Sequence, residues 1–197
     1  MKTLIFDLDG TIFNTKESVK ECLKLAIKKN IPEISMNEEI ILGPPLDELI
    51  EVAVPKASTR SIESIKKDFK SLYDTIYCTK CRFYAGIEQA LTLLHAKNYE
   101  LNVVTNKRLV PTISILEHFK VQHLFLAIKG SDNDSKQTNI KKLLLDQSKI
   151  IGNSIYIGDT LEDLRICQTL DLCFIGVTWG YDDLEDVVPK TNLVSDA

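Results

Sequence analysis

The sequence predicts an α/β fold, in which a doubly wound parallel sheet carries a small all-helical domain inserted after its first strand. Two patterns support this expectation. After residue 82, short apolar stretches alternate with amphipathic helical segments, whereas residues 14–82 show helical patterns only. Strands that alternate with helices form parallel sheets through right-handed crossovers, and the helices cover both faces. We therefore assign residues 1–13 and 83–197 to an α/β core and residues 14–82 to a helical cap.

The first predicted strand leads directly into acidic residues. Residues 4–6 form an apolar run typical of a buried strand, and Asp7 and Asp9 follow it. Gly10 indicates that the chain turns at that point. Two carboxylates so close together repel each other unless a cation lies between them or one is protonated. Both arrangements suit catalysis, whereas the alternative is a pair of solvated acids in a loop.

The predicted cap consists of four helices, one of them short, and a connecting loop. Helices are expected over residues 14–30, from about Pro45 to Ala53, and from Ser61 through Ile76. A further short helix is expected to begin at Ser35, because Glu38 stands three residues later, as in a capping box. A rigid Gly-Pro-Pro loop begins at Gly43. This loop is either a plain connector between helices or a segment that screens substrates, and we include Gly43 among the candidate substrate-binding residues.

The core alternates between strands and helices from residue 86 onward. Strands are expected at 101–105, 124–128, 154–157 and finally 172–177, and helices at 86–97, from Pro111 to Phe119, from Thr138 or Asn139 to Leu145, and at 161–170. On a parallel sheet, ligands bind beyond the carboxyl ends of the strands. The loops that follow these strands are therefore the places to look for chemistry.

Candidate catalytic side chains occur in four of those loops. They are Asp7 and Asp9, then Thr105 and Asn106, then Lys136, and then Asp159 and Asp163. Phosphoryl transfer needs a nucleophile, neutralisation of charge and a proton donor, and a carboxylate can serve as the nucleophile. Because a carboxylate and a phosphate repel each other, a hard cation such as Mg²⁺ must bridge them.

Each of these side chains has a chemical role that suits the reaction. Asp7, Asp159 and Asp163 offer oxygen ligands for Mg²⁺, although Asp163 is also well placed to cap its helix. Lys136 can neutralise phosphate charge. The Thr105 hydroxyl can donate a hydrogen bond to phosphate oxygens. Further candidates for substrate contact are Gly10, Thr11 and Asn106, the last of which is equally well explained as a turn residue.

The order of these motifs resembles that of the haloacid dehalogenase-like hydrolases, a superfamily made mostly of Mg²⁺-dependent phosphatases. The resemblance rests on Asp7-Leu8-Asp9-Gly10-Thr11, Thr105-Asn106, Lys136, and Gly158-Asp159-Thr160 with Asp163. It implies that Asp7 is the nucleophile and forms an aspartyl-phosphate. It also implies that Asp9 protonates the leaving group, later activates water, and binds Mg²⁺ through its backbone carbonyl. Residues 176–181 resemble the phosphoglycolate phosphatase and pyrophosphatase branch.

Two positions depart from the pattern of that superfamily. Gln137 follows Lys136 where many relatives have proline, so Lys129 is a rival for the role of the motif lysine. We favour Lys136 because a loop before a helix is where a phosphate ligand belongs. Asn14 stands where relatives often have an acid, near the hinge of the cap.

Composition indicates which partners to expect. The 197 residues carry a formal net charge of −4, which argues against general nucleic-acid binding through a basic surface. The apolar runs are shorter than the roughly 20 residues that span a bilayer, and acids interrupt the first of them, unlike in a signal peptide. Five cysteines without disulfide-framework spacing favour a reduced, cytoplasmic setting. Cys78 and Cys81 have no second pair that would complete a structural zinc site.

These observations predict a Mg²⁺-dependent phosphatase that acts on small phosphomonoesters, with a small phosphorylated metabolite as its partner. One alternative is a phosphomutase or a pyrophosphatase built on the same core. The other alternative is a non-catalytic protein that binds phosphorylated ligands, because a fold by itself does not establish a function.

Overall fold

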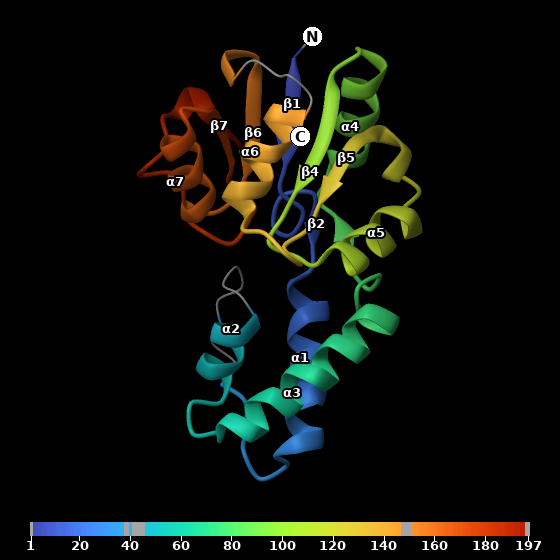
Figure 1. Cartoon of the computed structure of the whole chain (residues 1–197), viewed down its shortest axis with the longest axis vertical. Coiled ribbons are helices and arrows are strands. Elements are labelled where there is room, and N and C mark those ends of the chain that lie inside the picture. Colours follow the sequence, from blue (N-terminus) through green and yellow to red (C-terminus); the bar gives the residue numbers. More distant parts are fainter. Residues whose placement is uncertain (1, 38–39, 41–45, 147–150, 196–197) are drawn as a thin grey trace. The chain divides into compact units, whose positions relative to one another are not determined.

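The computed structural model describes residues 2–37, 40, 46–146 and 151–195 (Figure 1). The chain divides into two compact units. One comprises Met1–Asn14 and Arg82–Ala197, and the other comprises Thr15–Cys81.

The larger unit is built on one six-stranded sheet with the strand order β5-β4-β1-β6-β7-β8. All five strand pairings in this sheet are parallel. The strands are β1 (Thr3–Phe6), β4 (Glu100–Val104), β5 (Phe125–Lys129), β6 (Ser154–Gly158), β7 (Cys173–Val177) and β8 (Leu193–Val194). Helices α4 (Ile87–Ala96), α5 (Leu109–His118), α6 (Lys136–Asp146) and α7 (Leu161–Leu170) flank the sheet (Figure 1). The predicted α/β fold with a helical insert is confirmed.

Strand β1 lies inside the sheet between β4 and β6, and all four of its residues are buried. It pairs with β4 on one side, where Leu4 faces Leu101, and with β6 on the other, where Leu4 faces Ile155. A strand buried on both faces needs a nearly continuous apolar sequence, and residues 4–6 provide one. The ladder continues one bond further, from the Asp7 amide to the Ile157 carbonyl at 2.9 Å, which fixes Asp7 at the carboxyl edge of the sheet.

Three sequence expectations for this unit need correction. The strand at 172–177 is not the last, because the short strand β8 extends the sheet beyond it. Helix α6 begins at Lys136 rather than after Thr138 or Asn139. Lys136 therefore lies in the first turn of a helix and not in a loop, and this was missed because Ser135 and Thr138 both have the side chain of a capping residue.

The smaller unit is helical throughout its described secondary structure. It contains α1 (Lys16–Asn30), α2 (Leu46–Ala53), α3 (Thr59–Leu72) and a π-helical turn at Tyr73–Tyr77. Leu23 on α1 and Ile65 and Phe69 on α3 are buried. Phe69 stacks on Tyr73 with ring centroids 5.3 Å apart, and Lys29 pairs with Asp68 at 2.7 Å. The apolar face of α1 thus packs inward against α3.

Two expectations for this unit also need correction. Ser58 rather than Ser61 caps α3, and its hydroxyl accepts the Ser61 amide at 3.2 Å. Residues 35–37 are not helical, although Ser35 has the capping-box spacing. The loop that begins at Gly43 lies outside the described residues. None of the helices in the described part of the chain combines the length and apolar character needed to cross a membrane.

A two-stranded antiparallel ribbon stands where the chain leaves the larger unit and where it returns. Strand β2 (Phe13–Asn14) pairs with β3 (Arg82–Phe83), and Asn14 faces Arg82. Phe13 stacks on Phe83 at 4.5 Å between centroids and lies 4.8 Å from Phe119. The aromatic contacts anchor the ribbon to the larger unit, so both ends of the inserted segment are fixed at adjacent positions.

Candidate active site

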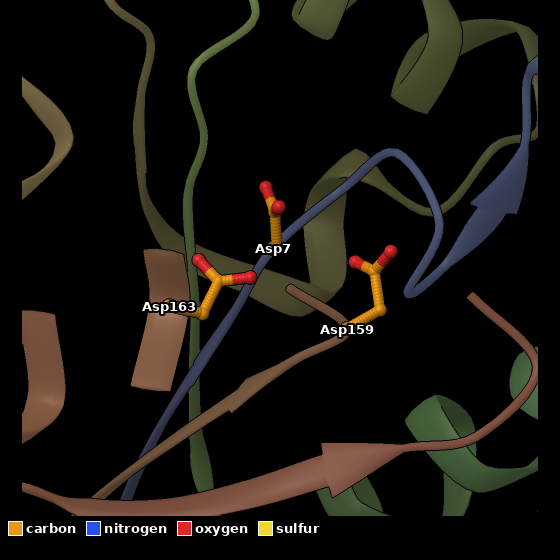
Figure 2. A group of neighbouring side chains, drawn as sticks. All are labelled: Asp7, Asp159 and Asp163. Atoms are coloured by element: carbon orange, nitrogen blue, oxygen red, sulfur yellow. The ribbon is translucent and has the colours of Figure 1, made fainter. Parts of the chain in front are cut away.

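Three buried carboxyl groups meet at the carboxyl edge of the sheet. Asp7 directly follows β1, Asp159 directly follows β6, and Asp163 lies in the first turn of α7. Each offers an oxygen, and these oxygens all lie within 4.8 Å of one another (Figure 2). The exposed fractions of the residues are 5%, 0% and 0%. Topology alone brings these side chains together, because β1 and β6 are neighbours in the sheet although about 150 residues separate them in the chain.

Lys136 is the cation that faces this cluster. Its Nζ lies 2.9 Å from Asp7 Oδ2 and 2.7 Å from Asp163 Oδ1, and the residue is 3% exposed. Burial acts to lower the pKa of Lys136, but the charges of Asp163 and Asp7 outweigh it and hold the pKa above the usual value. The ammonium group therefore stays charged. The rival, Lys129, pairs instead with Asp146 at 3.2 Å.

One ammonium group does not neutralise three carboxyl groups, and the pKa values reflect this. Burial raises the pKa of Asp7 to about 6; Lys136 lowers it, and Asp163 raises it. Burial also raises the pKa of Asp159 well above its usual range, and the nearby charges of Asp7 and Asp163 add to this effect. Oxygen ligands with surplus negative charge in a buried cluster are what a hard divalent cation requires. The donor set thus fits Mg²⁺.

Asp159 is held in place from two sides by glycines. A Cβ atom at Gly10 would lie 2.0 Å from Asp159 Oδ2, and one at Gly180 would lie 2.1 Å from Asp159 Cβ. Gly10 also has a φ of +81°, which other residues resist. The Thr11 hydroxyl donates to Asp159 Oδ1 at 2.8 Å, and the Tyr181 amide donates to Oδ2 at 2.9 Å. The turn after β1 and the loop after β7 therefore fix this carboxylate, which itself follows β6.

Asp163 caps its helix, which is one of the two roles that the sequence suggested for it. It completes a capping box with Thr160, whose hydroxyl donates to Asp163 Oδ2 at 2.7 Å and accepts the Asp163 amide at 3.2 Å. Its other oxygen accepts the hydrogen bond from Lys136. The helix cap thus orients the same carboxylate that the cluster uses.

Thr105 and Asn106 follow β4 at the same edge of the sheet. Thr105 is buried, and hydrogen bonds from Lys136 and Thr105 help to lower the pKa of Asp7. The Asn106 amide group donates to Glu162 Oε2 at 3.0 Å. In this structure the side chain of Asn106 is therefore bound by Glu162 on α7.

Asp9 lies beside a lysine that sequence reasoning overlooked. Lys107 Nζ is 2.9 Å from Asp9 Oδ2. Its position directly after Thr105-Asn106 was the available signal, since a cation in a loop at the carboxyl edge suits an anionic site. Trp179 also lies near the site: its indole N–H donates to the Thr11 carbonyl at 3.1 Å, and its ring centroid lies 5.9 Å from that of Tyr84.

Comparison with protein families gives an independent result. The model of the haloacid dehalogenase-like hydrolases matches residues 4–177 of this chain. The matched region begins in β1 and ends with β7, so it includes every strand of the sheet except β8.

Individual relatives are distant but cover most of the chain. A 5'-nucleotidase of Pseudomonas aeruginosa is 26% identical over 93% of this chain and 86% of its own length. A phosphoglycolate phosphatase of Pasteurella multocida is 26% identical over 92% and 87%. A pyrophosphatase of Listeria monocytogenes is 24% identical over 90% and 83%.

Solved structures show the same fold. A hydrolase of the haloacid dehalogenase-like family from Streptococcus pneumoniae has a TM-score of 0.85 at 22% identity, covering 95% of this chain and 89% of that one. A crystal structure from Haemophilus somnus, described as a predicted phosphoglycolate phosphatase, has a TM-score of 0.88 at 22% identity, covering 100% and 94%.

Proposed function

The chain belongs to the family of haloacid dehalogenase-like hydrolases, and we propose that it is a Mg²⁺-dependent phosphatase that acts on small phosphomonoesters through an aspartyl-phosphate on Asp7. The observation that carries this proposal is the buried cluster of Asp7, Asp159 and Asp163, whose oxygens lie within 4.8 Å of one another around a single lysine. The relatives that are named as phosphatases support the reaction class.

Asp7 is well suited to be the nucleophile. Its two oxygens are oriented separately, because the Leu8 amide donates to Oδ1 at 2.7 Å and Lys136 donates to Oδ2 at 2.9 Å. A carboxylate with fixed orientation can attack phosphorus without a costly rearrangement. Lys136 is also placed to balance charge as the phosphoryl group arrives, and the Thr105 hydroxyl is a donor for a phosphate oxygen.

Mg²⁺ would be held by Asp7, Asp159, Asp163 and the backbone carbonyl of Asp9, and when bound it would neutralise the phosphate and the carboxylates that face it. The fit rests on the surplus of buried carboxyl groups over cations. Thr11 and Tyr181 hold Asp159 in the orientation that the cluster needs. Thr160 does the same for Asp163.

Asp9 is the proposed acid and base. Its proton would pass to the leaving-group oxygen as the bond to phosphorus breaks, and the resulting carboxylate would then accept a proton from the water that hydrolyses the aspartyl-phosphate.

The helical unit Thr15–Cys81 is the proposed cap, which would select substrates and exclude water during the first step. Gly43, which lies outside the described residues, remains a candidate for substrate contact.

Phosphate release from a panel of substrates tests the proposal. The panel contains 2-phosphoglycolate, a 5'-nucleoside monophosphate, other small esters and pyrophosphate, and each is assayed with Mg²⁺ and with EDTA. We expect release that requires Mg²⁺ and is lost in Asp7→Asn. Trapping of a phosphorylated wild-type chain that is absent from Asp7→Asn would identify the intermediate. A folded wild-type protein that releases phosphate from none of these compounds would refute the proposal.

Pyrophosphate hydrolysis is the second candidate, because a pyrophosphatase is among the relatives that cover most of the chain. It would use the same nucleophile and metal ligands, with phosphate as the leaving group. Pyrophosphate at the top of the ranking in the panel would favour it over the phosphomonoesterase.

A further inference from the structure

Asp9 has one carboxylate oxygen that is paired and one that is not. Oδ2 lies 2.9 Å from Lys107 Nζ, and the two side chains are 22% and 9% exposed respectively. Oδ1 is buried and has no hydrogen-bond partner within the described part of the chain. Buried polar atoms are nearly always paired, so a buried oxygen without a partner needs an explanation. An oxygen whose partner arrives with the substrate would provide one.

The backbone of Lys107 is fixed at both of its polar groups. Its amide donates to Thr105 Oγ1 at 3.2 Å, and its carbonyl accepts the Ser131 amide at 3.0 Å. Ser131 also donates its hydroxyl to the Asn106 carbonyl. The loop after β4 is thereby tied to the loop after β5, and the Lys107 side chain starts from a rigid base.

The Lys107–Asp9 pair differs from the ion pairs on the surface. Lys142 and Asp134, for example, approach to 2.7 Å but keep 52% and 31% of their side chains exposed. Such exposed pairs are screened by water and fix little. The Lys107 side chain is only 9% exposed, so the surrounding atoms restrict its rotamers and it can hold Asp9 in one orientation.

We propose that Lys107 is a positioning residue, which binds Asp9 through Oδ2 and thereby presents Oδ1 as the oxygen that transfers the proton to the leaving group. The inference rests on the proposed function. In the step concerned, an oxygen of Asp7 forms a bond to phosphorus and the bond from phosphorus to the leaving oxygen breaks. The electron pair of that bond stays on the leaving oxygen, which takes the proton from Asp9 Oδ1.

A pair of substrates with similar shape but different leaving groups separates positioning from general damage. Phenol is a poorer leaving group than p-nitrophenol, so phenyl phosphate depends on proton donation more than p-nitrophenyl phosphate does. The quantity to compare is kcat/KM, because it reports the steps up to departure of the leaving group and excludes hydrolysis of the aspartyl-phosphate. The variants are Lys107→Met and, as a matched control at an exposed ion pair, Lys142→Met.

We expect Lys107→Met to lower kcat/KM for phenyl phosphate about tenfold or more beyond its effect on p-nitrophenyl phosphate, as a misplaced general acid loses part of its 10²–10⁴-fold contribution. Asp9→Asn should show the same selective loss, and Lys142→Met should change neither substrate. Equal losses on the two substrates, or no loss, would overturn the proposal, since a merely structural lysine would not sense the leaving group.

Crystal structures of the wild type and of Lys107→Met provide a readout that does not depend on turnover. The proposal expects the Asp9 carboxylate to turn away or lose order in the variant. An Asp9 side chain that keeps its orientation without Lys107 would overturn it. If the wild type released no phosphate at all, the proposed function would fail, and the orientation of Asp9 would still decide whether Lys107 positions it.

Discussion

Asp7 is a carboxyl group whose environment opposes its own ionisation. Burial raises its pKa from 3.8 to about 6, although Lys136 partly offsets this. A fold retains such a group only where other constraints hold it, and here the Asp7 amide is the last rung of the ladder to β6. The unfavourable charge is confined to the place where a metal ion and a phosphate would meet.

The raised pKa of Asp7 predicts that the metal-free protein loses stability as pH rises. Between about pH 4 and pH 6 the folded protein binds a proton on Asp7 that the unfolded chain has released, so the contribution of Asp7 to the free energy of unfolding falls across that window. It is fully present below pH 4 and absent above about pH 6. With 1.36 kcal/mol per pKa unit, the change is about 2–3 kcal/mol.

Urea unfolding of the wild type and of Asp7→Asn in EDTA, at pH 4 and at pH 7, measures this contribution. The wild type should lose more stability than the variant on going to pH 7, and Mg²⁺ should reduce the difference. Parallel pH profiles for the two proteins would contradict the prediction.

Lys136 supplies the compensating charge, and its removal should be costly. Lys136→Met leaves Asp7 and Asp163 buried without their cation, and breaking a buried pair in this way costs about 3–5 kcal/mol. The loss should be smaller at pH 5 than at pH 8, because Asp7, whose pKa burial raises to about 6, can then take up a proton. Chemical denaturation at both pH values checks this, and Lys142→Met, at an exposed pair, is the control. A Lys136→Met protein as stable as the wild type would show that the pair has no net role in folding.

At the scale of elements, the site depends on loops that pack directly against one another. The turn after β1 contributes Gly10 and Thr11, and the loop after β7 contributes Gly180 and Tyr181. Together they enclose Asp159, which follows β6. The approach is so close that neither glycine position has space for a side chain.

Gly180→Ala should therefore disturb the candidate metal site. The added Cβ would lie 2.1 Å from Asp159 Cβ, so the loop or the carboxylate must shift. Overpacking of this kind costs about 1–3 kcal/mol. Gly152→Ala is a matched control, because nothing lies within 4 Å of its added Cβ.

Thermal unfolding and Mg²⁺ titration of both variants measure the effect. We expect weaker Mg²⁺ binding and lower stability for Gly180→Ala and no change in Mg²⁺ binding for Gly152→Ala. Equal Mg²⁺ affinity in the two variants would show that the position of Asp159 does not depend on this loop.

At the scale of the whole molecule, the two units have separate cores. The larger unit buries Ile5, Val104 and Tyr156 within its own sheet and helices, and the smaller unit buries Leu23 and Ile65 between its own helices. The chain passes between the units only beside the ribbon, where Asn14 faces Arg82. We therefore expect the larger unit to fold without the inserted segment.

Replacement of residues 15–81 by Asn-Gly should convert the ribbon into a hairpin, because this dipeptide favours the two-residue turn that joins antiparallel strands. We expect the shortened protein to unfold cooperatively and to retain activity on p-nitrophenyl phosphate, with a flatter ranking over the substrate panel. Circular dichroism and the panel assay test this. A shortened protein that folds and keeps the full ranking would refute the proposed role of the cap in selectivity.

The sequence by itself determined the α/β class, the helical insert, and the order of the motifs from Asp7 to Asp163. These features are local: residues 4–6 specify a buried strand, and amphipathic periodicity specifies the helices. The sequence predictions were wrong where two residues are both suited to cap a helix, as Ser58 and Ser61 are at the start of α3. They also missed β2, β3 and β8, because strands of two residues are too short to show an apolar pattern.

Only the tertiary structure decided which side chains meet. Lys136 rather than Lys129 faces Asp7, and Lys107 pairs with Asp9, because strand order places the loops after β1, β4, β5 and β6 at one edge. Gly180 is required by a contact with Asp159 that no sequence pattern records. Such pairings depend on the register of strands distant in sequence, whereas sequence periodicity reports only which face of each element is buried.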